Sequence, residues 1–189
     1  DLGADYAQCA RWAKESGADC VETNFSCPNV STCDGQLFQQ PADSQLVTQM
    51  VRDAIGDLPY IAKIGRIPQR EDAEALLAAV HESVDALAMT NSIASTVMKP
   101  DGGYLFDGER RGICGAATLH ASVEQTAMLA GLIETEQYQL ELIGVGGAAC
   151  WPDVQAYLQA GARAVHIATA AMITPSTAWE IRQQMTAEN

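Results

Sequence analysis

The stretch CVETNFSCPN, residues 20–29, joins a short strand-like segment to a run of polar side chains. Asn24, Cys27 and Asn29 all fall within this run, directly after the strand-like segment. Because an asparagine side chain offers both a hydrogen-bond donor and an acceptor, two of them can hold the edge of a planar amide or imide ring. A cysteine between them can exchange a proton with that ring. The stretch therefore predicts a strand that ends in a substrate-binding and catalytic site.

The rest of the chain continues this alternation of strands and helices. Apolar runs predict strands near residues 19–24, 60–64, 84–90, 140–145 and 164–168, and helical periodicity predicts helices near residues 4–16, 44–55, 71–83, 117–135, 153–160 and 176–186. This order indicates a parallel sheet, and the run AVHIA at 164–168 suits a strand covered on both faces. A barrel and a doubly wound sheet both satisfy the pattern. We favour the α/β class with a (β/α)8 barrel because the candidate site residues follow the carboxyl ends of several strands.

The composition limits the classes of function. At 189 residues the chain is long enough for one domain with a sizeable core, and 48% of its residues are apolar. A formal net charge of −13 disfavours binding to nucleic acid or to an anionic membrane. No apolar run approaches the ~18 residues that cross a bilayer, and the sequence does not open with a basic-then-apolar signal pattern. We therefore expect a cytoplasmic protein.

The cysteines and histidines predict no metal site. The six cysteines form no CxxC pair, and the three histidines show no ligand spacing, so core or surface packing is the expected role of each histidine. A reduced protein is favoured, and a disulfide between Cys27 and Cys33 is the less favoured alternative. A free cysteine is usually a small buried apolar residue, so it is the neighbouring asparagines that favour a catalytic role for Cys27.

Two further groups of residues predict a binding site for a charged ligand. Lys63 interrupts the apolar strand at 60–64, and a buried charge is costly unless it is paired. The alternative is a lysine that reaches solvent from the end of the strand. Gly146–Gly147 follow one predicted strand and Ala168–Thr169 end the next, which makes backbone N–H groups available to an anion such as a phosphate. Phosphate sites occur at this place in many barrels, so the signal is not specific to one ligand.

These motifs resemble those of the dihydroorotate dehydrogenases. Residues 24–29 are similar to the Asn-x-Ser-Cys-Pro-Asn stretch that follows the fourth strand of that family's flavin-binding barrel, and GQLF at 35–38 resembles its soluble, NAD-linked branch. The resemblance implies an FMN-dependent oxidation of dihydroorotate, or of a related dihydropyrimidine, to the 5,6-unsaturated pyrimidine. It implies that Cys27 is the base that removes the proton from C5 while hydride leaves C6 for flavin N5.

The resemblance also implies which residues bind the ligands. The substrate-binding residues would be Asn24, Asn29, Asn91 and Ser92, and the FMN-binding residues would be Lys63, Gly115, Gly146, Gly147, Ala168 and Thr169. In the family the lysine faces the N1–C2 edge of the isoalloxazine. The chain departs from the family pattern at Arg66, Arg111, Cys114 and Ala168, of which the last places a methyl group where the family usually has glycine.

The resemblance covers strands four to eight of the barrel and the helix before them. Residues 1–189 would then be the C-terminal part of a single FMN-binding TIM-barrel domain, whereas a full barrel has eight strand–helix units in ~250 residues. Because such a segment has unpaired strand edges, we expect it to associate with another copy or with the missing N-terminal half of the barrel, and to be inactive alone. The resemblance further implies a small-molecule pyrimidine substrate and allows an electron-transfer subunit as a partner.

Other functions fit the same residues. A dihydropyrimidine dehydrogenase-like flavoenzyme would act on a different ring; such enzymes place an acid cysteine later in the loop, where Cys33 lies, but have histidine at the position of Asn29. A phosphate-binding barrel isomerase or lyase without a redox cofactor would share the residues after the last two strands. A non-catalytic remnant is a weaker third alternative.

Overall fold

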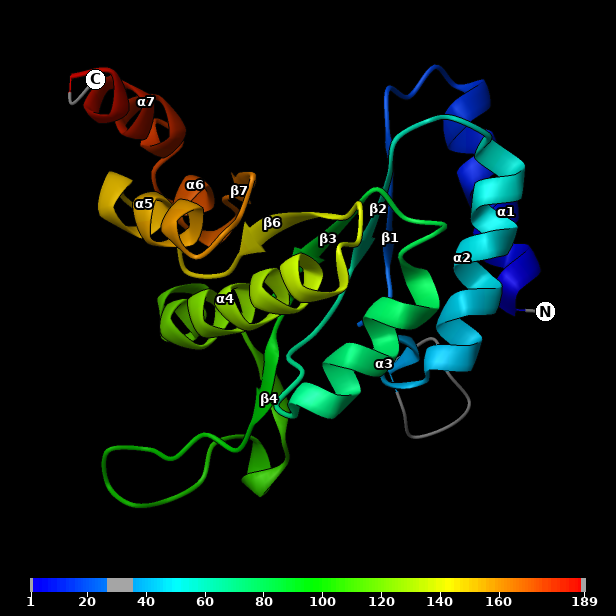
Figure 1. Ribbon diagram of the computed structural model, residues 1–189. Helices are drawn as coiled ribbons and strands as arrows, with labels where there is room; N and C mark the ends of the chain where they lie inside the picture. Colours follow the sequence, from blue (N-terminus) through cyan, green and yellow to red (C-terminus); the bar gives the residue numbers. More distant parts are fainter. Residues whose placement is uncertain (1, 27–35, 188–189) are drawn as a thin grey trace.

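The protein is built on a five-stranded parallel sheet (Figure 1). The computed structural model describes residues 2–26 and 36–187. The strands lie side by side in chain order: β1 (Val21–Asn24), β2 (Tyr60–Lys63), β3 (Ala86–Met89), β6 (Glu141–Val145) and β7 (Ala164–His166). Since a helix lies between each pair of neighbouring strands, the arrangement is consistent with part of a (β/α)8 barrel, as predicted.

The helices confirm the predicted alternation. They are α1 (Leu2–Glu15), α2 (Pro41–Ile55), α3 (Arg70–Val80), α4 (Leu119–Glu136), α5 (Trp151–Gln159), α6 (Thr169–Ile173) and α7 (Thr177–Ala187). Helix α2 begins at Pro41 instead of Ser44, because proline has a preset φ and needs no N–H partner in the first turn. The short helix α6 was not predicted. Within residues 2–26 and 36–187, no helix is long and apolar enough to cross a membrane.

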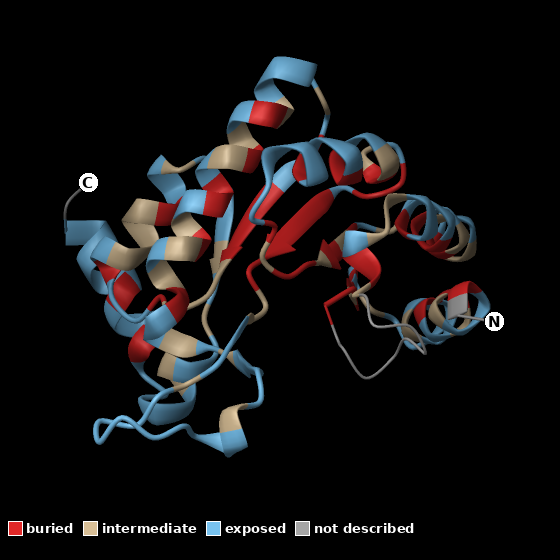
Figure 2. Cartoon of the chain, turned by 90° about the horizontal axis from the view of Figure 1, so that it is seen from below, coloured by how far each residue is buried: buried red, intermediate tan, exposed pale blue. Residues whose placement is uncertain are grey.

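The main core lies between the sheet and the helices on its outer face, as the buried residues in Figure 2 show. Side chains alternate along each strand, so Val21 and Thr23 of β1 are buried against the helices while Glu22 points to the inner face. On β2, Tyr60 is fully buried and its hydroxyl lies 2.9 Å from the Thr23 hydroxyl. Burial raises the pKa of Tyr60 well above its ordinary value, so this phenol remains un-ionised.

One expectation for the sheet is wrong. The run at 164–168 was expected to form a strand covered on both faces, but Ala164 and His166 of β7 are exposed. The reason is position: β7 is an edge strand that pairs only with β6 in the described sheet. The apolar composition of residues 164–168 therefore indicates that they form a strand, but it does not indicate that both faces of that strand are buried.

The segment between β3 and α4 contains a hairpin, in a part of the chain for which no strand was predicted. Strands β4 (Ile93–Ser95) and β5 (Arg111–Ile113) pair antiparallel, and the chain between them extends away from the sheet (Figure 1). The side chains of Met98, Tyr104 and Phe106 are exposed on this extension. The hairpin projects from the end of the sheet at which β3 ends.

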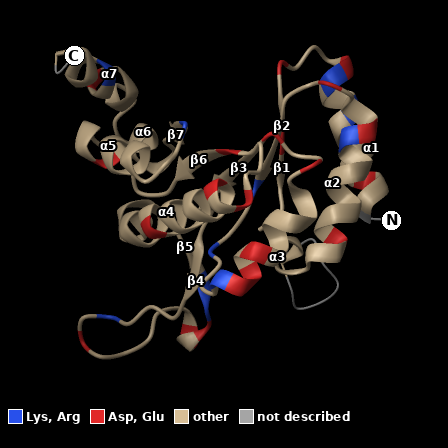
Figure 3. Cartoon of the chain, viewed as in Figure 1, with Lys and Arg blue, Asp and Glu red and all other residues tan. Residues whose placement is uncertain are grey.

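Charged residues lie mostly on the helices and connecting loops (Figure 3). In the parallel sheet the charged residues are Glu22, Lys63 and Glu141. A charge in a sheet needs a partner or access to water. Two of these three residues meet on the inner face, as described below.

Arg52 of α2 links the helix layer to the amino ends of the strands. Its guanidinium donates at 2.7–2.9 Å to the carbonyl oxygens of Gly56, Leu58 and Ser83 and to the carboxylate of Asp85. The same Asp85 carboxylate accepts the N–H of Tyr60 at 2.7 Å. The planar, fork-shaped donor set of arginine suits this convergence of acceptors. Arg52 therefore closes the end of the sheet opposite to the predicted site.

Replacing Arg52 should destabilise the protein more than replacing an ordinary surface arginine. We expect Arg52→Met to lower the free energy of unfolding by about 2–3 kcal/mol, because it leaves three carbonyls and a carboxylate without their charged donor. The matched control is Arg70→Met, which removes only an exposed pair with Glu74 and should change the free energy by less than about 0.5 kcal/mol. Urea unfolding measures both; equal losses would contradict the role of Arg52.

Candidate active site

A cavity of about 570 Å³ opens at the carboxyl ends of the strands. It is lined by residues at the ends of β2, β3, β6 and β7, among them Lys63, Asn91, Val145 and His166. The volume lies within the roughly 300–1,000 Å³ that small-molecule and cofactor sites occupy. Active sites of (β/α)8 barrels lie at this end of the sheet. The cavity is therefore the candidate active site of the described chain.

Three ionisable side chains meet on one wall of this cavity. Lys63 Nζ lies 2.8 Å from Glu22 Oε1, and His166 Nδ1 lies 3.7 Å from Glu22 Oε2. The Lys63 and Glu22 side chains are 23% and 27% exposed, so the pair is partly shielded from water. Lys63 is thus paired, and the reading of it as a strand-end lysine that simply reaches solvent does not describe the structure.

A glycine turn forms a second wall. Gly146 and Gly147 follow β6 with φ of +122° and +77°. Residues other than glycine rarely adopt backbone conformations in this region. A Cβ on Gly147 would lie 2.8 Å from the Leu119 Cβ and 2.9 Å from the Gly115 carbonyl oxygen. The turn is therefore pressed against the start of α4, and only backbone fits there.

Tyr157 of α5 contacts Gly146 of the glycine turn and Gly144 of β6. Its hydroxyl donates to the Gly146 carbonyl oxygen at 2.6 Å, and its ring lies where a Cβ on Gly144 would stand, 2.3 Å away. Burial raises the pKa of Tyr157 to about 12, so the hydroxyl remains a donor at physiological pH. Asp153 fixes the start of α5 by accepting the N–H groups of Ala149 and Cys150 at 2.9 and 3.2 Å.

The third wall comes from the segment after the hairpin. A Cβ on Gly115, whose φ is +75°, would lie 3.5 Å from the Thr169 Cγ2, so this segment approaches the end of β7 closely. The Cys114 thiol lies 3.8 Å from the Asn91 carbonyl oxygen and also lines the cavity. The segment around Gly115 and the segment around Thr169, which are far apart in the sequence, thus lie close together at this wall of the cavity.

The cavity gathers most of the predicted cofactor and substrate residues. Those that line it are Lys63, Asn91, Gly115, Gly146, Gly147, Ala168 and Thr169. Asn24 is not among them: its Oδ1 accepts the Ser26 N–H at 3.1 Å and the Ser26 hydroxyl at 2.8 Å. Ser92 is also outside the lining and lies against Gly112 of β5. Cys27 and Asn29 lie outside the described residues, as does Cys33.

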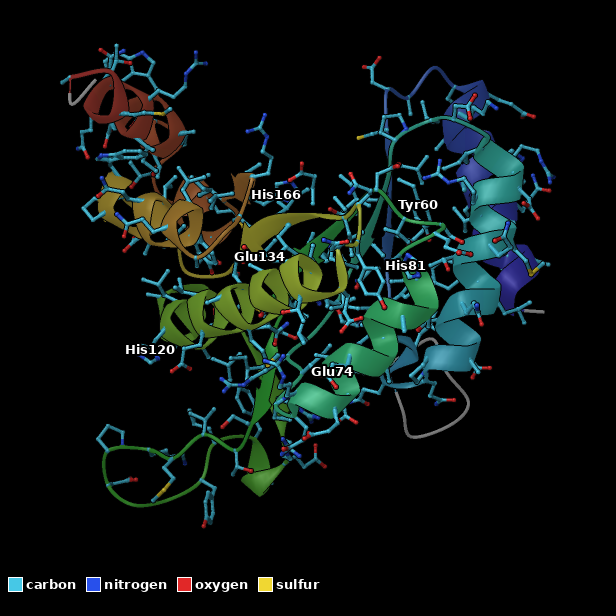
Figure 4. The ribbon with its side chains drawn as sticks, viewed as in Figure 1. Tyr60, Glu74, His81, His120, Glu134 and His166 are labelled. Atoms are coloured by element: carbon cyan, nitrogen blue, oxygen red, sulfur yellow. The ribbon has the colours of Figure 1, made fainter. Side chains whose placement is uncertain are left out.

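Sequence reasoning missed Glu22 and His166. Packing was the expected role of every histidine, but His166 lines the cavity and faces Glu22, and Figure 4 shows the three histidines on separate elements. A signal was present, because strand alternation places Glu22 on the same face as Asn24, two positions along β1. Among residues 2–26 and 36–187 no group of three or more His, Cys, Asp or Glu side chains could hold a metal ion.

Comparisons with known proteins agree with this geometry. Residues 3–188 match the family model described as dihydroorotate dehydrogenase. A dihydroorotate dehydrogenase of Dictyostelium discoideum is 30% identical over 93% of this chain and 49% of its own length. The catalytic subunit of dihydroorotate dehydrogenase B (NAD(+)) of Desulforudis audaxviator is 32% identical over 92% of this chain and 55% of its own length. The chain thus spans about half the length of the curated relatives that it matches.

Side chains should be excluded from the glycine turn. We expect Gly147→Ala to lower the free energy of unfolding by about 2 kcal/mol, because alanine is strained at positive φ and its Cβ has no room. The control is Gly131→Ala in α4, where nothing lies within 4 Å of the added Cβ and the helix gains about 0.5–1 kcal/mol. Urea unfolding of both variants is the measurement. A Gly147→Ala protein as stable as the parent would show that the turn is not constrained.

Proposed function

Because the chain belongs to the dihydroorotate dehydrogenase family, we propose that it forms the cofactor-holding part of an FMN-dependent oxidoreductase that converts dihydroorotate to orotate. The observation that carries this proposal is the cavity, which brings together residues from the ends of β2, β3, β6 and β7. In this proposal residues 1–189 are the C-terminal part of a single FMN-binding barrel domain.

The residues of the cavity fit FMN. The glycine turn after β6 and the residues Ala168 and Thr169 after β7 present backbone to an anion, as a flavin phosphate requires. Lys63 presents a cation at the end of β2, and Gly115 allows the opposite wall to come close. The Ala168 methyl, where the family usually has glycine, still leaves the backbone N–H available. We propose these residues as the FMN ligands.

The chemistry that FMN supplies when it is bound is acceptance of a hydride from the substrate. Cys27 is proposed as the base: its sulfur takes the proton from C5, so the C5–H bond breaks as an S–H bond forms. Asn24, Asn29, Asn91 and Ser92 are proposed to hold the amide, imide and carboxylate groups of the ring by hydrogen bonds. The Lys63 ammonium places positive charge where negative charge accumulates during the reaction.

Two observations support the proposed cellular location and the proposed partners of the enzyme. The described cysteines, Cys9, Cys20, Cys114 and Cys150, are free thiols, which supports the proposed cytoplasmic location. Several relatives are named as catalytic subunits, which supports a separate electron-transfer subunit as a partner. Another copy of the chain, or the rest of a barrel, is proposed to cover the open edges of β1 and β7.

An anaerobic absorbance spectrum tests the cofactor and the substrate together. We expect residues 1–189, purified together with the remainder of the proposed barrel, to show a flavin band that bleaches when dihydroorotate is added. A band that bleaches with dihydrouracil and not with dihydroorotate would move the function to a dihydropyrimidine dehydrogenase-like enzyme. Absence of any flavin, with a retained sugar phosphate, would contradict the redox proposal in favour of an isomerase or lyase.

The role of Cys27 is tested by the rate of that bleaching. We expect Cys27→Ala to slow flavin reduction by dihydroorotate about 10²-fold or more, because positioned general bases contribute at least this much. The matched control is Cys9→Ala, which removes an exposed thiol of α1 and should leave the rate unchanged. Stopped-flow absorbance measures both, and an unchanged rate in Cys27→Ala would remove the thiol from the reaction.

A further inference from the structure

Glu22 contacts basic side chains from two strands that are far apart in the sheet. Its Oε1 lies 2.8 Å from the Lys63 ammonium of β2, and its Oε2 lies 3.7 Å from the His166 imidazole of β7. Strands β1 and β7 are the two edges of the five-stranded sheet. The contact between Glu22 and His166 therefore links the two edges across the inner face. All three side chains line the cavity. One negative charge is therefore shared by two bases at the ligand site.

The Lys63–Glu22 contact differs from an ordinary surface ion pair. Both side chains are about one quarter exposed, whereas the Arg70–Glu74 pair of α3 is about half exposed. A pair in a partly shielded cavity is less screened by water and salt, so it constrains its partners more strongly. Because lysine carries its charge on a flexible four-carbon chain, a fixed carboxylate determines where that charge lies.

The contact with His166 is of a different kind. The His166 side chain is 45% exposed and lies farther from the carboxylate than the Lys63 amine does. Imidazoles change charge between about pH 5 and pH 8, whereas an ammonium does not. Among residues 2–26 and 36–187, the titratable groups that line the cavity are Glu22, Lys63, Cys114 and His166. Protonation of His166 therefore adds a second positive charge that competes with Lys63 for the same carboxylate.

We propose that Glu22 is a positioning residue that fixes the Lys63 ammonium in the cavity and, through its contact with His166, sets how much of the lysine charge a bound ligand experiences. The proposal rests on the proposed function insofar as that ligand is FMN. When His166 is neutral, Glu22 is engaged mainly by Lys63 and offsets its charge. When His166 is protonated, the Glu22 carboxylate interacts with both His166 and Lys63. It then offsets less of the lysine charge, and the ligand experiences more of that charge.

Competitive labelling of lysines tests the contact without any flavin. The chain has three lysines, Lys14, Lys63 and Lys99, of which the first and last are exposed and serve as internal references. We expect Glu22→Gln to raise acetylation of Lys63 by acetic anhydride, relative to the references, by about threefold to tenfold, because an amine released from an ion pair reacts more readily with the reagent. Peptide mass spectrometry gives the ratio.

The control for this experiment lies on α4. Glu124 faces His120 at 3.5 Å on the exposed surface of that helix, so Glu124→Gln removes an equivalent carboxylate and should leave the Lys63 ratio unchanged. An unchanged ratio in Glu22→Gln would overturn the proposal, because Lys63 would then not depend on Glu22.

The part of His166 is tested by pH in the same assay. In the parent protein we expect the normalised Lys63 labelling to be about twofold higher at pH 6 than at pH 8, since protonated His166 draws the carboxylate from Lys63. In His166→Gln this difference should vanish. A difference that persists in His166→Gln, or is absent from the parent, would overturn the competition between the two bases.

The effect on a bound ligand is measured by the reduction potential of the flavin. We expect Glu22→Gln to favour the reduced form about tenfold at pH 8, which is ~30 mV for a two-electron couple, because a negative charge beside the lysine is lost. Glu124→Gln should leave the potential unchanged. If the labelling ratio changes but the potential does not, Glu22 pairs with Lys63 without acting on the ligand, and the proposal fails. If no flavin is bound at all, the proposed function fails while the labelling still decides the contact.

Discussion

A charged side chain on the inner face of a parallel sheet needs a partner or access to water, and the contact of Lys63 with Glu22 supplies a partner. The pair joins neighbouring strands β1 and β2 through their side chains as well as through the backbone ladder. Because both residues are directed to the inner face, the outer face of these strands carries no charge and packs against the helices. The ligand cavity and the core are thus separated by the pleat of the strands, with charge on one side and apolar packing on the other.

The amino ends of the strands are held by charged side chains, whereas the carboxyl ends form the ligand cavity. At the amino ends, Arg52 and Asp85 tie the helix layer to the strands by charged hydrogen bonds to the backbone. At the carboxyl ends, glycines and small residues leave backbone exposed to a ligand, held in place by Tyr157 and the start of α4. This division is the one found in (β/α)8 enzymes, where stability and chemistry occupy opposite faces. The match to the family extends over residues 3–188, although the chain spans about half of its relatives' length.

Much of the fold could be predicted from the sequence because the strands and long helices have strong periodicity. The hairpin β4–β5 could not, since Ile93–Ser95 and Arg111–Ile113 form no continuous apolar run. Helix α6 could not, since its five residues are too few to show a helical period. For the site, the motifs singled out Lys63 and the glycine turn, and the structure places both at the cavity. They could not show that the Asn24 side chain is engaged by Ser26, because that depends on the local turn of the backbone. Glu22 and His166 were missed because their proximity arises only when the two sheet edges are brought together.

The hairpin has a mechanical consequence for the cavity. Strand β4 starts two residues after Asn91, and β5 ends one residue before Cys114, so both legs of the hairpin are rooted in cavity-lining residues. The legs are joined to each other by their own antiparallel ladder. Because the ladder couples the two legs, a displacement of the long extension would act on Asn91 and Cys114 together and not on either residue alone.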